Sequence, residues 1–452
     1  MKKVLLINPW IYDFSAFDFW LKPLGLLYIA SFLEKIGFKV SLLDCLDRFH
    51  SAMLREEIKP VKRKYGTGKF HAEEVEKPTA IKSVPKRYKR FGIPYSIVRE
   101  ELRKKRDVDV ILITSVMTYW YQGVFEMIRI LREEIPGARI ILGGIYPTLL
   151  PEHTLKESGA DAVIPGLDFY PLLRELGTNA KKEFIPEEFF NTFSPAYHLY
   201  EKLPYVSMLT SLGCPFHCTY CVSNILQKRF FTIEKEKVIN EIDTYINKLK
   251  VKDIVFYDDA LLYNKDKHFL PLFEEVLKRK FKVRFHTPNG INARFITKDV
   301  AELLFMCNFK TIRIGLESCQ TGFLKGTGGK VTCEEVSLAV SNLTGAGIPK
   351  ENIGIYIMAG RDDEKIEDVI KTLRFVGRLG TSVFVSEYSP VPGSRDWERS
   401  GNFKKLDPLW QNNSIAFLKN GWEFEEIQKV KNLKELINYA ATNHIDLSSL
   451  LG

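Results

Sequence analysis

Short apolar runs alternate with amphipathic stretches of helical length, and this alternation restricts the fold of the chain more than any other feature. In the first part of the sequence each run is a nearly continuous series of leucine and β-branched residues, as in parallel strands buried on both faces. Helical stretches between successive runs supply the crossovers that parallel strands need. We predict an α/β, doubly wound Rossmann-like domain at residues 1–170, with strands at 4–7, 39–43, 108–114, 138–142 and 160–164.

The same alternation resumes after residue 204 and continues for six strands. Six βα units predict a (βα)6 partial TIM barrel at residues 205–400, whose open side would admit a large substrate. Residues 401–452 are interpreted as a helical extension. The predicted barrel strands are 205–209, 254–257, 283–287, 311–316, 353–358 and 382–388.

Two segments interrupt this pattern. Residues 171–204 carry few structural signals and are interpreted as a linker. Residues 48–107 are rich in Lys and Arg interleaved with aromatic residues, a composition that can contact nucleic acid or an acidic substrate. No nucleic-acid-binding signature accompanies this charge, so we favour a partly ordered surface insertion that covers the cofactor face, and nucleic acid is not an expected partner.

Cys214, Cys218 and Cys221 form a C-x3-C-x2-C array directly after the first barrel strand. Three thiolates on one loop can bind three irons of a 4Fe-4S cluster and leave the fourth iron open to a small molecule. A structural zinc site would need a fourth ligand in tetrahedral geometry. His217 lies inside the array, but no second ligand pair follows at finger-like spacing. The spacing therefore favours an iron–sulfur cluster over zinc.

The array resembles the signature of the radical S-adenosylmethionine enzymes, including the aromatic Tyr220 before the last cysteine. In that family the open iron binds S-adenosylmethionine, and one electron from the cluster cleaves it to a 5′-deoxyadenosyl radical that abstracts hydrogen from the substrate. The resemblance implies that Cys214, Cys218 and Cys221 are the metal ligands and the catalytic residues. It also implies an electron donor such as flavodoxin or ferredoxin as a partner.

Polar residues gather at the predicted strand ends of the barrel, where barrel active sites lie. Asp258 and Asp259 follow an apolar strand, where a buried carboxylate needs a cation. In the family this position meets the methionine ammonium of the cofactor, so the resemblance gives that role to Asp258 or Asp259. The other residues expected on the S-adenosylmethionine side are Asn289, Asn292, Arg294, Glu317, Met358, Gly360 and Pro390.

The strand ends of the N-terminal region resemble the cobalamin-binding domain fused to many of these enzymes. Glycine pairs let the backbone approach a large flat ring, and hydroxyl groups at strand ends can meet the oxygens of its nucleotide tail. A Rossmann-like scaffold whose glycines only turn the chain is the alternative. The residues implied on the cobalamin side are Asn8, Pro9, Pro23, Leu24, Gly25, Ser115, Val116, Thr118, Gly143, Gly144, Tyr146, Thr148 and Gly166.

The region departs from that family pattern in two places. The Asp-x-His-x-x-Gly motif by which some cobalamin proteins ligate cobalt is absent, so no lower axial histidine is predicted. Relatives usually end the domain with Gly-Glu-Gly-Glu, whereas this chain has Gly-Leu-Asp-Phe at 166–169, so part of the contact with cobalamin differs.

The remaining cysteines of the barrel region, Cys307, Cys319 and Cys333, match no cluster spacing and are interpreted as ordinary thiols. Seven cysteines without a disulfide-rich pattern indicate a reducing compartment, so we expect a cytoplasmic protein. No stretch is long enough to span a membrane, and the first apolar run is too short for a signal peptide.

The resemblance covers nearly the whole chain and implies cobalamin-dependent methylation of an unactivated carbon in a small-molecule, peptide or lipid substrate. Ring-forming or rearranging chemistry, and a radical enzyme whose N-terminal domain does not bind cobalamin, are the enzymatic alternatives. A non-catalytic iron–sulfur protein that binds RNA through residues 48–107 is an alternative from another class. Failure to cleave S-adenosylmethionine together with salt-dependent RNA binding would favour it.

Overall fold

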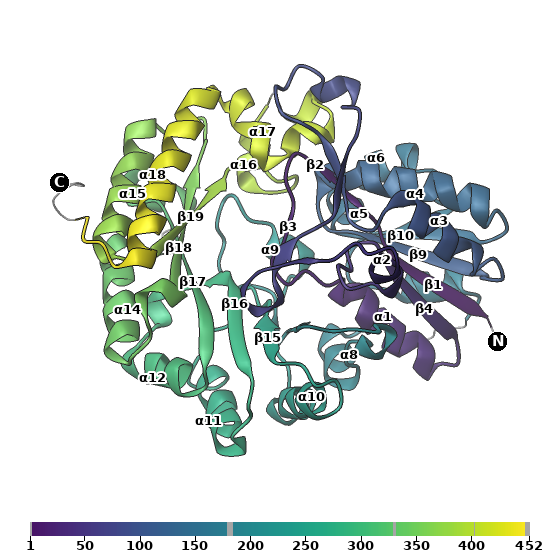
Figure 1. Ribbon diagram of the computed structural model, residues 1–452, viewed down its shortest axis with the longest axis horizontal. Helices are drawn as coiled ribbons and strands as arrows, with labels where there is room; N and C mark the ends of the chain where they lie inside the picture. Colours follow the sequence, from purple (N-terminus) through teal and green to yellow (C-terminus); the bar gives the residue numbers. More distant parts are fainter. Residues whose placement is uncertain (1, 179–183, 329–330, 402, 448–452) are drawn as a thin grey trace. The chain divides into compact units, whose positions relative to one another are not determined.

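The computed structural model describes residues 2–178, 184–328, 331–401 and 403–447 (Figure 1). They form two compact units. The first comprises Met1–Ser207 with Asp407–Trp410, and the second comprises Met208–Leu406 with Gln411–Gly452.

Five parallel strands form the main sheet of the first unit, with β1 at its centre. The side chains of residues 4–7 in β1 are fully buried, as expected for a strand with helices on both faces. The chain adds β4 on one side of β1 and then β9, β10 and β11 on the other, so the strand order reverses next to β1. The predicted doubly wound sheet is confirmed, and its order is β11 (Ala162–Ile164), β10 (Arg139–Gly144), β9 (Val110–Ser115), β1 (Lys3–Asn8) and β4 (Lys39–Asp44).

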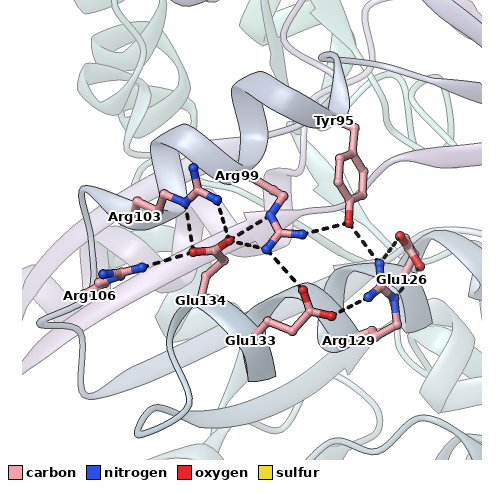
Figure 2. Close-up of polar contacts among 8 residues, drawn as sticks. All are labelled: Tyr95, Arg99, Arg103, Arg106, Glu126, Arg129, Glu133 and Glu134. Atoms are coloured by element: carbon pink, nitrogen blue, oxygen red, sulfur yellow. Dashed lines mark hydrogen bonds and ion pairs between the residues drawn. The ribbon is translucent and has the colours of Figure 1, made fainter.

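An ion-pair network joins two helices of this unit around Glu134 (Figure 2). Arg103 Nε donates to the Glu134 carboxylate at 3.1 Å and Arg99 Nε at 2.7 Å, while Arg106 Nη2 lies 3.4 Å from it. Hydrogen bonds from these guanidinium groups, that of Arg103 first, lower the pKa of Glu134 to about 2. The helices of the unit are α1 (Leu24–Lys35), α2 (Ser51–Arg55), α3 (Tyr95–Arg103), α4 (Tyr121–Glu134), α5 (Ile145–Leu149), α6 (Pro151–Glu157), α7 (Tyr170–Glu175) and α8 (Pro186–Thr192).

Residues 48–107 are more ordered than the sequence predicted. They supply strands to two small antiparallel sheets, each completed by a strand from the segment after β1. Buried side chains such as Ile81 and Tyr88 fix the segment within the first unit. The prediction of a partly ordered insertion was therefore wrong. The sheets are β2 (Ile11–Asp13), β8 (Lys89–Phe91) and β7 (Ala72–Glu74), and β3 (Phe17–Asp18), β6 (Gly68–Lys69) and β5 (Val61–Lys62).

Residues 171–204, interpreted above as a linker, carry most of α7 and all of α8. The aromatic residues Phe189 and Phe190 of α8 are buried in the first unit. This part of the chain therefore belongs to the core of that unit rather than to an extended connection.

Six strands form the sheet of the second unit, in the same order as in the sequence. Phe256, Phe273, Phe285 and Phe309 stack together in its core. Since the first and last strands do not pair with each other, the sheet is an open barrel, as predicted. Its strands are β12 (Val206–Met208), β15 (Asp253–Phe256), β16 (Arg284–Ile291), β17 (Phe309–Glu317), β18 (Ile353–Ala359) and β19 (Ser382–Glu387).

The last long helix covers the edge strand of this barrel. The side-chain amide of Asn438 donates to Val383 O at 2.9 Å and accepts from Val383 N at 2.7 Å, so it occupies the backbone groups that a further strand would use. The remaining helices and short strands of the unit are β13 (Ser211–Leu212), α9 (Ser223–Leu226), β14 (Phe231–Thr232), α10 (Lys235–Asn247), α11 (Phe269–Arg279), α12 (Lys298–Met306), α13 (Thr321–Thr327), α14 (Cys333–Gly345), α15 (Ile366–Leu379), α16 (Arg395–Arg399), α17 (Asn413–Ala416) and α18 (Phe424–Asn443). In the described part of the chain, no helix has the length and apolar character needed to cross a membrane.

Candidate functional site: the cysteine loop and the glycine-rich cleft

The three cysteines of the array lie on one loop of the second unit, residues 213–222, which we call the cysteine loop. It leaves β13, which pairs with β14, and ends at α9. Gly213 begins the loop at φ +80°, where a Cβ would come within 2.7 Å of Arg229 O, so this turn requires glycine. Cys214, Cys218 and Cys221 are partly exposed, and none of them forms a disulfide. A loop with this donor set fits a cluster that binds one iron per thiolate.

Asp258, at the end of β15, anchors the start of this loop. Its Oδ1 accepts hydrogen bonds from Thr210 N at 3.0 Å, Thr210 Oγ1 at 2.7 Å and Ser211 Oγ at 2.6 Å. Burial raises the pKa of Asp258 to about 6 despite these donors. Thr210 Oγ1 also lies 2.8 Å from His268 Nε2, and burial lowers the pKa of His268 to about 4, so the histidine is neutral at pH 7.

The structure shows that Asp258 and Asp259 differ in burial, which the sequence could not show. The carboxylate of Asp258 is buried and occupied by Thr210 and Ser211, whereas Asp259 is exposed. The role of Asp258 or Asp259 as the contact for a cofactor ammonium stays a prediction.

The far end of the loop is held by residues that the sequence analysis missed. The backbone N–H of Asp396, in α16, donates to Thr219 O at 3.0 Å. Asp396 is itself fixed by a buried ion pair with Arg361 at 2.8 Å and by the hydroxyl of Tyr388 at 3.2 Å. Arg361 directly follows Gly360, one of the residues predicted on the S-adenosylmethionine side, which was the available signal.

Aromatic side chains surround the loop within the second unit. Phe216 lies edge-on to Tyr263 at 6.1 Å between centroids, and Phe230 and Phe295 contact the same tyrosine. Burial, followed by the charge of Glu317, raises the pKa of Tyr220 well above its ordinary value, so its hydroxyl stays protonated.

The polar residues predicted after the third barrel strand lie at the end of β16 and just beyond it, and most of them are engaged inside the unit. Asn289 Nδ2 donates to Tyr257 O at 2.9 Å, and Asn292 Oδ1 accepts from Arg294 N at 3.0 Å. The buried Asn292 Nδ2 has no partner in the structure, so among these groups it is the donor available to a ligand. Arg294 Nε pairs with Glu335 at 2.7 Å on the surface.

The later strand ends carry the remaining predicted residues. Glu317 ends β17 with φ +64°, a conformation uncommon outside glycine. Met358 is buried near the end of β18, and Pro390 follows β19. Gly360 N donates to Glu364 at 3.1 Å, and Gly360 O accepts from Asn420 at 2.7 Å. A shared site for these residues and the cysteine loop stays a prediction.

The first unit contains a cleft at the carboxyl edge of its sheet, where ligands of such sheets bind, and strands β9, β10 and β11 contribute to its lining. Four of the predicted cobalamin-side residues line it, namely Gly25, Gly143, Gly144 and Gly166. A Cβ on Gly144 would lie within 2.7 Å of Ser115 O, so this approach of two strand ends requires glycine. The other residues lining the cleft are Leu26, Tyr28, Ile29, Leu112, Ile113, Thr114, Ile141, Ile164, Leu167, Asp168, Phe169, Leu172, Phe184, Phe189 and Phe190.

Most polar residues predicted for this side bond within the protein instead. Asn8 Nδ2 donates to Asp44 at 2.7 Å, and Thr148 Oγ1 donates to Gly144 O at 2.6 Å. Ser115 Oγ donates to Met117 O at 3.2 Å. Tyr146 OH lies 2.6 Å from His153 Nδ1. The predicted residues outside the cleft lining are Asn8, Pro9, Pro23, Leu24, Ser115, Val116, Thr118, Tyr146 and Thr148.

The apolar wall of the cleft comes from residues that the sequence analysis did not assign to a site. Phe184, Phe189 and Phe190 come from the segment interpreted as a linker, and Phe190 packs edge-on against Tyr28 at 4.7 Å. The density of aromatic residues in that segment was the missed signal. A glycine edge opposite an aromatic wall fits a flat heterocyclic base.

The described residues contain no group of three or more His, Cys, Asp or Glu side chains close enough to hold a single metal ion. A 4Fe-4S cluster does not need its ligands to meet at a single ion, because each cysteine thiolate binds a different iron of the cluster. The prediction for the other cysteines was partly wrong, since Cys319 and Cys333 form a disulfide. Cys307 is a buried free thiol, as expected.

Comparison with known proteins agrees with this division of the chain. Residues 208–373 match the radical SAM superfamily, and residues 97–168 match the B12 binding domain. An uncharacterized methyltransferase of Pyrococcus horikoshii, PH0819, is 25% identical over 329 residues, which cover 65% of this chain and 70% of that protein. Cytidylyl-2-hydroxyethylphosphonate methyltransferase of Streptomyces wedmorensis is 21% identical, with 95% and 88% covered.

A relative with a different reaction also matches. Anaerobic magnesium-protoporphyrin IX monomethyl ester cyclase of Rubrivivax gelatinosus is 22% identical, over 61% of this chain and 56% of the cyclase. Among solved structures, the radical S-adenosylmethionine methyltransferase TsrM of Kitasatospora setae superposes with a TM-score of 0.63 at 15% identity, over 89% of this chain and 76% of TsrM. That likeness shows a shared fold.

Proposed function

We propose that this chain, which belongs to the radical S-adenosylmethionine enzymes that carry a B12-binding domain, is a cobalamin-dependent methyltransferase acting on an unactivated carbon. The proposal rests on two features of one chain: a loop with three cysteines in C-x3-C-x2-C spacing, none of them in a disulfide, and an apolar cleft with a glycine edge at the carboxyl ends of a B12-type sheet. Two of the curated relatives that match are methyltransferases.

The two units would hold different cofactors. Cys214, Cys218 and Cys221 would bind a 4Fe-4S cluster, with Asp259 and Asn292 directed to S-adenosylmethionine. The cleft would take the nucleotide end of cobalamin between its glycine edge and the rings of Phe189 and Phe190. When bound, these cofactors supply a substrate radical and a transferable methyl group.

The chain itself contributes positioning. Asp258 holds the backbone just before the cysteine loop, and the backbone of Asp396 holds Thr219 inside it. The open barrel leaves its sheet unclosed between β12 and β19, which suits a substrate larger than a closed barrel admits.

Anaerobic reconstitution with iron, sulfide and hydroxocobalamin, followed by desalting, tests the proposal. We expect about four irons and about one cobalt per chain, and reductive cleavage of S-adenosylmethionine to 5′-deoxyadenosine. Cys221→Ser should abolish cleavage, whereas Cys307→Ser, which changes a buried thiol outside the loop, should preserve it. Iron without cobalt would contradict the methyltransferase proposal and turn the cleft into a candidate substrate site.

The match to the cyclase supports a second candidate, ring closure without methyl transfer. The two reactions differ in one product. A methyltransferase forms S-adenosylhomocysteine in proportion to methylated substrate, whereas a cyclase turns over without it.

A further inference from the structure

A disulfide joins Cys319 and Cys333 at the carboxyl end of β17. Their Cα atoms lie 5.7 Å apart, although 14 positions separate them in the sequence. Cys319 comes two residues after the end of β17, and Cys333 is the first residue of α14. The disulfide therefore joins the carboxyl end of β17 to the start of α14.

We call the described residues between Cys319 and Cys333 the disulfide loop. Its residues Thr327 and Gly328 lie against the cysteine loop. Thr327 O accepts a hydrogen bond from Thr219 N at 3.4 Å. A Cβ built on Gly328 would come within 3.5 Å of His217 O and 3.9 Å of the Cα of Cys218. The disulfide loop thus contacts the backbone between the first and last cysteines of the array.

Thr219 is held from two independent sides. Its carbonyl accepts from Asp396 N at 3.0 Å, a contact that depends on the ion pair with Arg361. Its N–H donates to Thr327 of the disulfide loop. Reducing the Cys319–Cys333 disulfide would let the disulfide loop move and would weaken the hydrogen bond from Thr219 N to Thr327 O.

We propose that Cys319 and Cys333 are a redox-responsive pair that sets how firmly the cysteine loop is held. A dithiol reductant opens the pair by exchange: one thiolate attacks a sulfur of the disulfide, and the second thiol then displaces the mixed disulfide. The reductant becomes a cyclic disulfide, and its two electrons and two protons pass to the thiols of Cys319 and Cys333. Both cysteines are partly exposed, so a small dithiol reaches them.

The consequence for a cluster rests on the proposed function, but the redox pair and its contact with Thr219 do not. The test therefore uses the full chain without cofactors, under anaerobic conditions. Differential alkylation and mass spectrometry identify the thiols that become free on treatment with dithiothreitol. Hydrogen exchange of the peptide containing Thr219 is measured before and after that treatment.

We expect the amides around Thr219 to exchange roughly tenfold faster after reduction. The double variant Cys319→Ser/Cys333→Ser should exchange fast in both conditions, and Cys333→Ser alone should do the same if the double variant folds poorly. Cys307→Ser removes a buried thiol of the same unit and should respond to the reductant as the wild type does.

Equal exchange at Thr219 in the two redox states would overturn the proposal, as would free thiols at Cys319 and Cys333 after treatment with oxidised glutathione. In the reconstituted protein, the double variant should also release iron to a chelator faster than Cys307→Ser. A chain that binds no iron yet shows the exchange difference would contradict the proposed function and leave the redox pair in place.

Discussion

The buried carboxylate of Asp258 accepts hydrogen bonds from both the backbone N–H and the hydroxyl of Thr210, at 3.0 and 2.7 Å. Thr210 lies four residues before the first cysteine of the array. Because both donors belong to Thr210, the carboxyl group fixes the backbone and the side chain of the same residue. Of the two aspartates that the sequence predicts near a cofactor, Asp258 is thus also a positioning residue for the loop, whereas Asp259 is exposed.

Asp258→Asn should change how stability depends on pH. Burial raises the pKa of this carboxyl from 3.8 to about 6 in the folded chain, so its contribution to stability is complete below about pH 4 and is lost as the pH rises through about 6. Relative to the variant, the wild type should lose about 3 kcal/mol of unfolding free energy between about pH 4 and about pH 7. Denaturant titrations at the two pH values measure this difference. Asp259→Asn, at an exposed position, should show none, and parallel pH curves for Asp258→Asn and wild type would contradict the prediction.

Arg361→Met should destabilise the second unit and loosen the end of the cysteine loop. The substitution leaves the carboxylate of Asp396 buried without its cation, which costs about 3 kcal/mol. Thermal unfolding and hydrogen exchange at Thr219 report the two effects. Arg395→Met serves as the control, because Arg395 is an exposed arginine on α16, the short helix that also carries Asp396. Unchanged exchange at Thr219 in Arg361→Met would show that the ion pair does not support the loop.

Gly143→Ile should fill the cleft of the first unit without unfolding it. A Cβ at this position meets only Ile164 O, at 3.5 Å, so the backbone tolerates a side chain that projects into the cleft. We expect cobalamin retention to fall roughly tenfold or more after reconstitution, because the added side chain occupies the volume of the ligand. Gly137→Ser, in an exposed turn outside the cleft, should retain cobalt like the wild type. Full cobalt retention by Gly143→Ile would place cobalamin elsewhere.

Glu134→Gln should remove a contribution to stability that depends on a charged carboxylate. The hydrogen bonds from Arg103 and Arg99 hold the folded pKa of Glu134 at about 2, below its ordinary value of 4.5 (Figure 2). Its contribution is therefore present above about pH 4.5 and is lost as the pH falls through about 2. Denaturation at about pH 7 should show a less stable variant, and the difference from wild type should shrink in acid. Glu133→Gln, in which a half-exposed carboxylate of the same helix is changed, should cost less. A difference independent of pH would attribute the effect to packing instead.

The sequence by itself determined the features that depend on local pattern. Continuous apolar runs such as residues 4–7 form parallel strands because both of their faces are buried. Such a run can be recognised from the sequence alone. The spacing of Cys214, Cys218 and Cys221 is equally local, since a few residues of backbone bring the thiols to one loop.

Only the tertiary structure decided which side chains share a surface. Asp258 and Asp259 are neighbours in sequence, yet burial against Thr210 separates their roles. Arg361 and Asp396 meet across 35 positions, and Cys319 and Cys333 across 14, because strands and helices carry them to the same edge of the barrel. The aromatic wall of the cleft, with Phe189 and Phe190, arises in a segment whose short helix is set by packing and not by its own periodicity. The spacing of residues that are close in sequence predicts which of their side chains lie together. Contacts between residues far apart in sequence depend on how the buried faces of the helices and strands pack together.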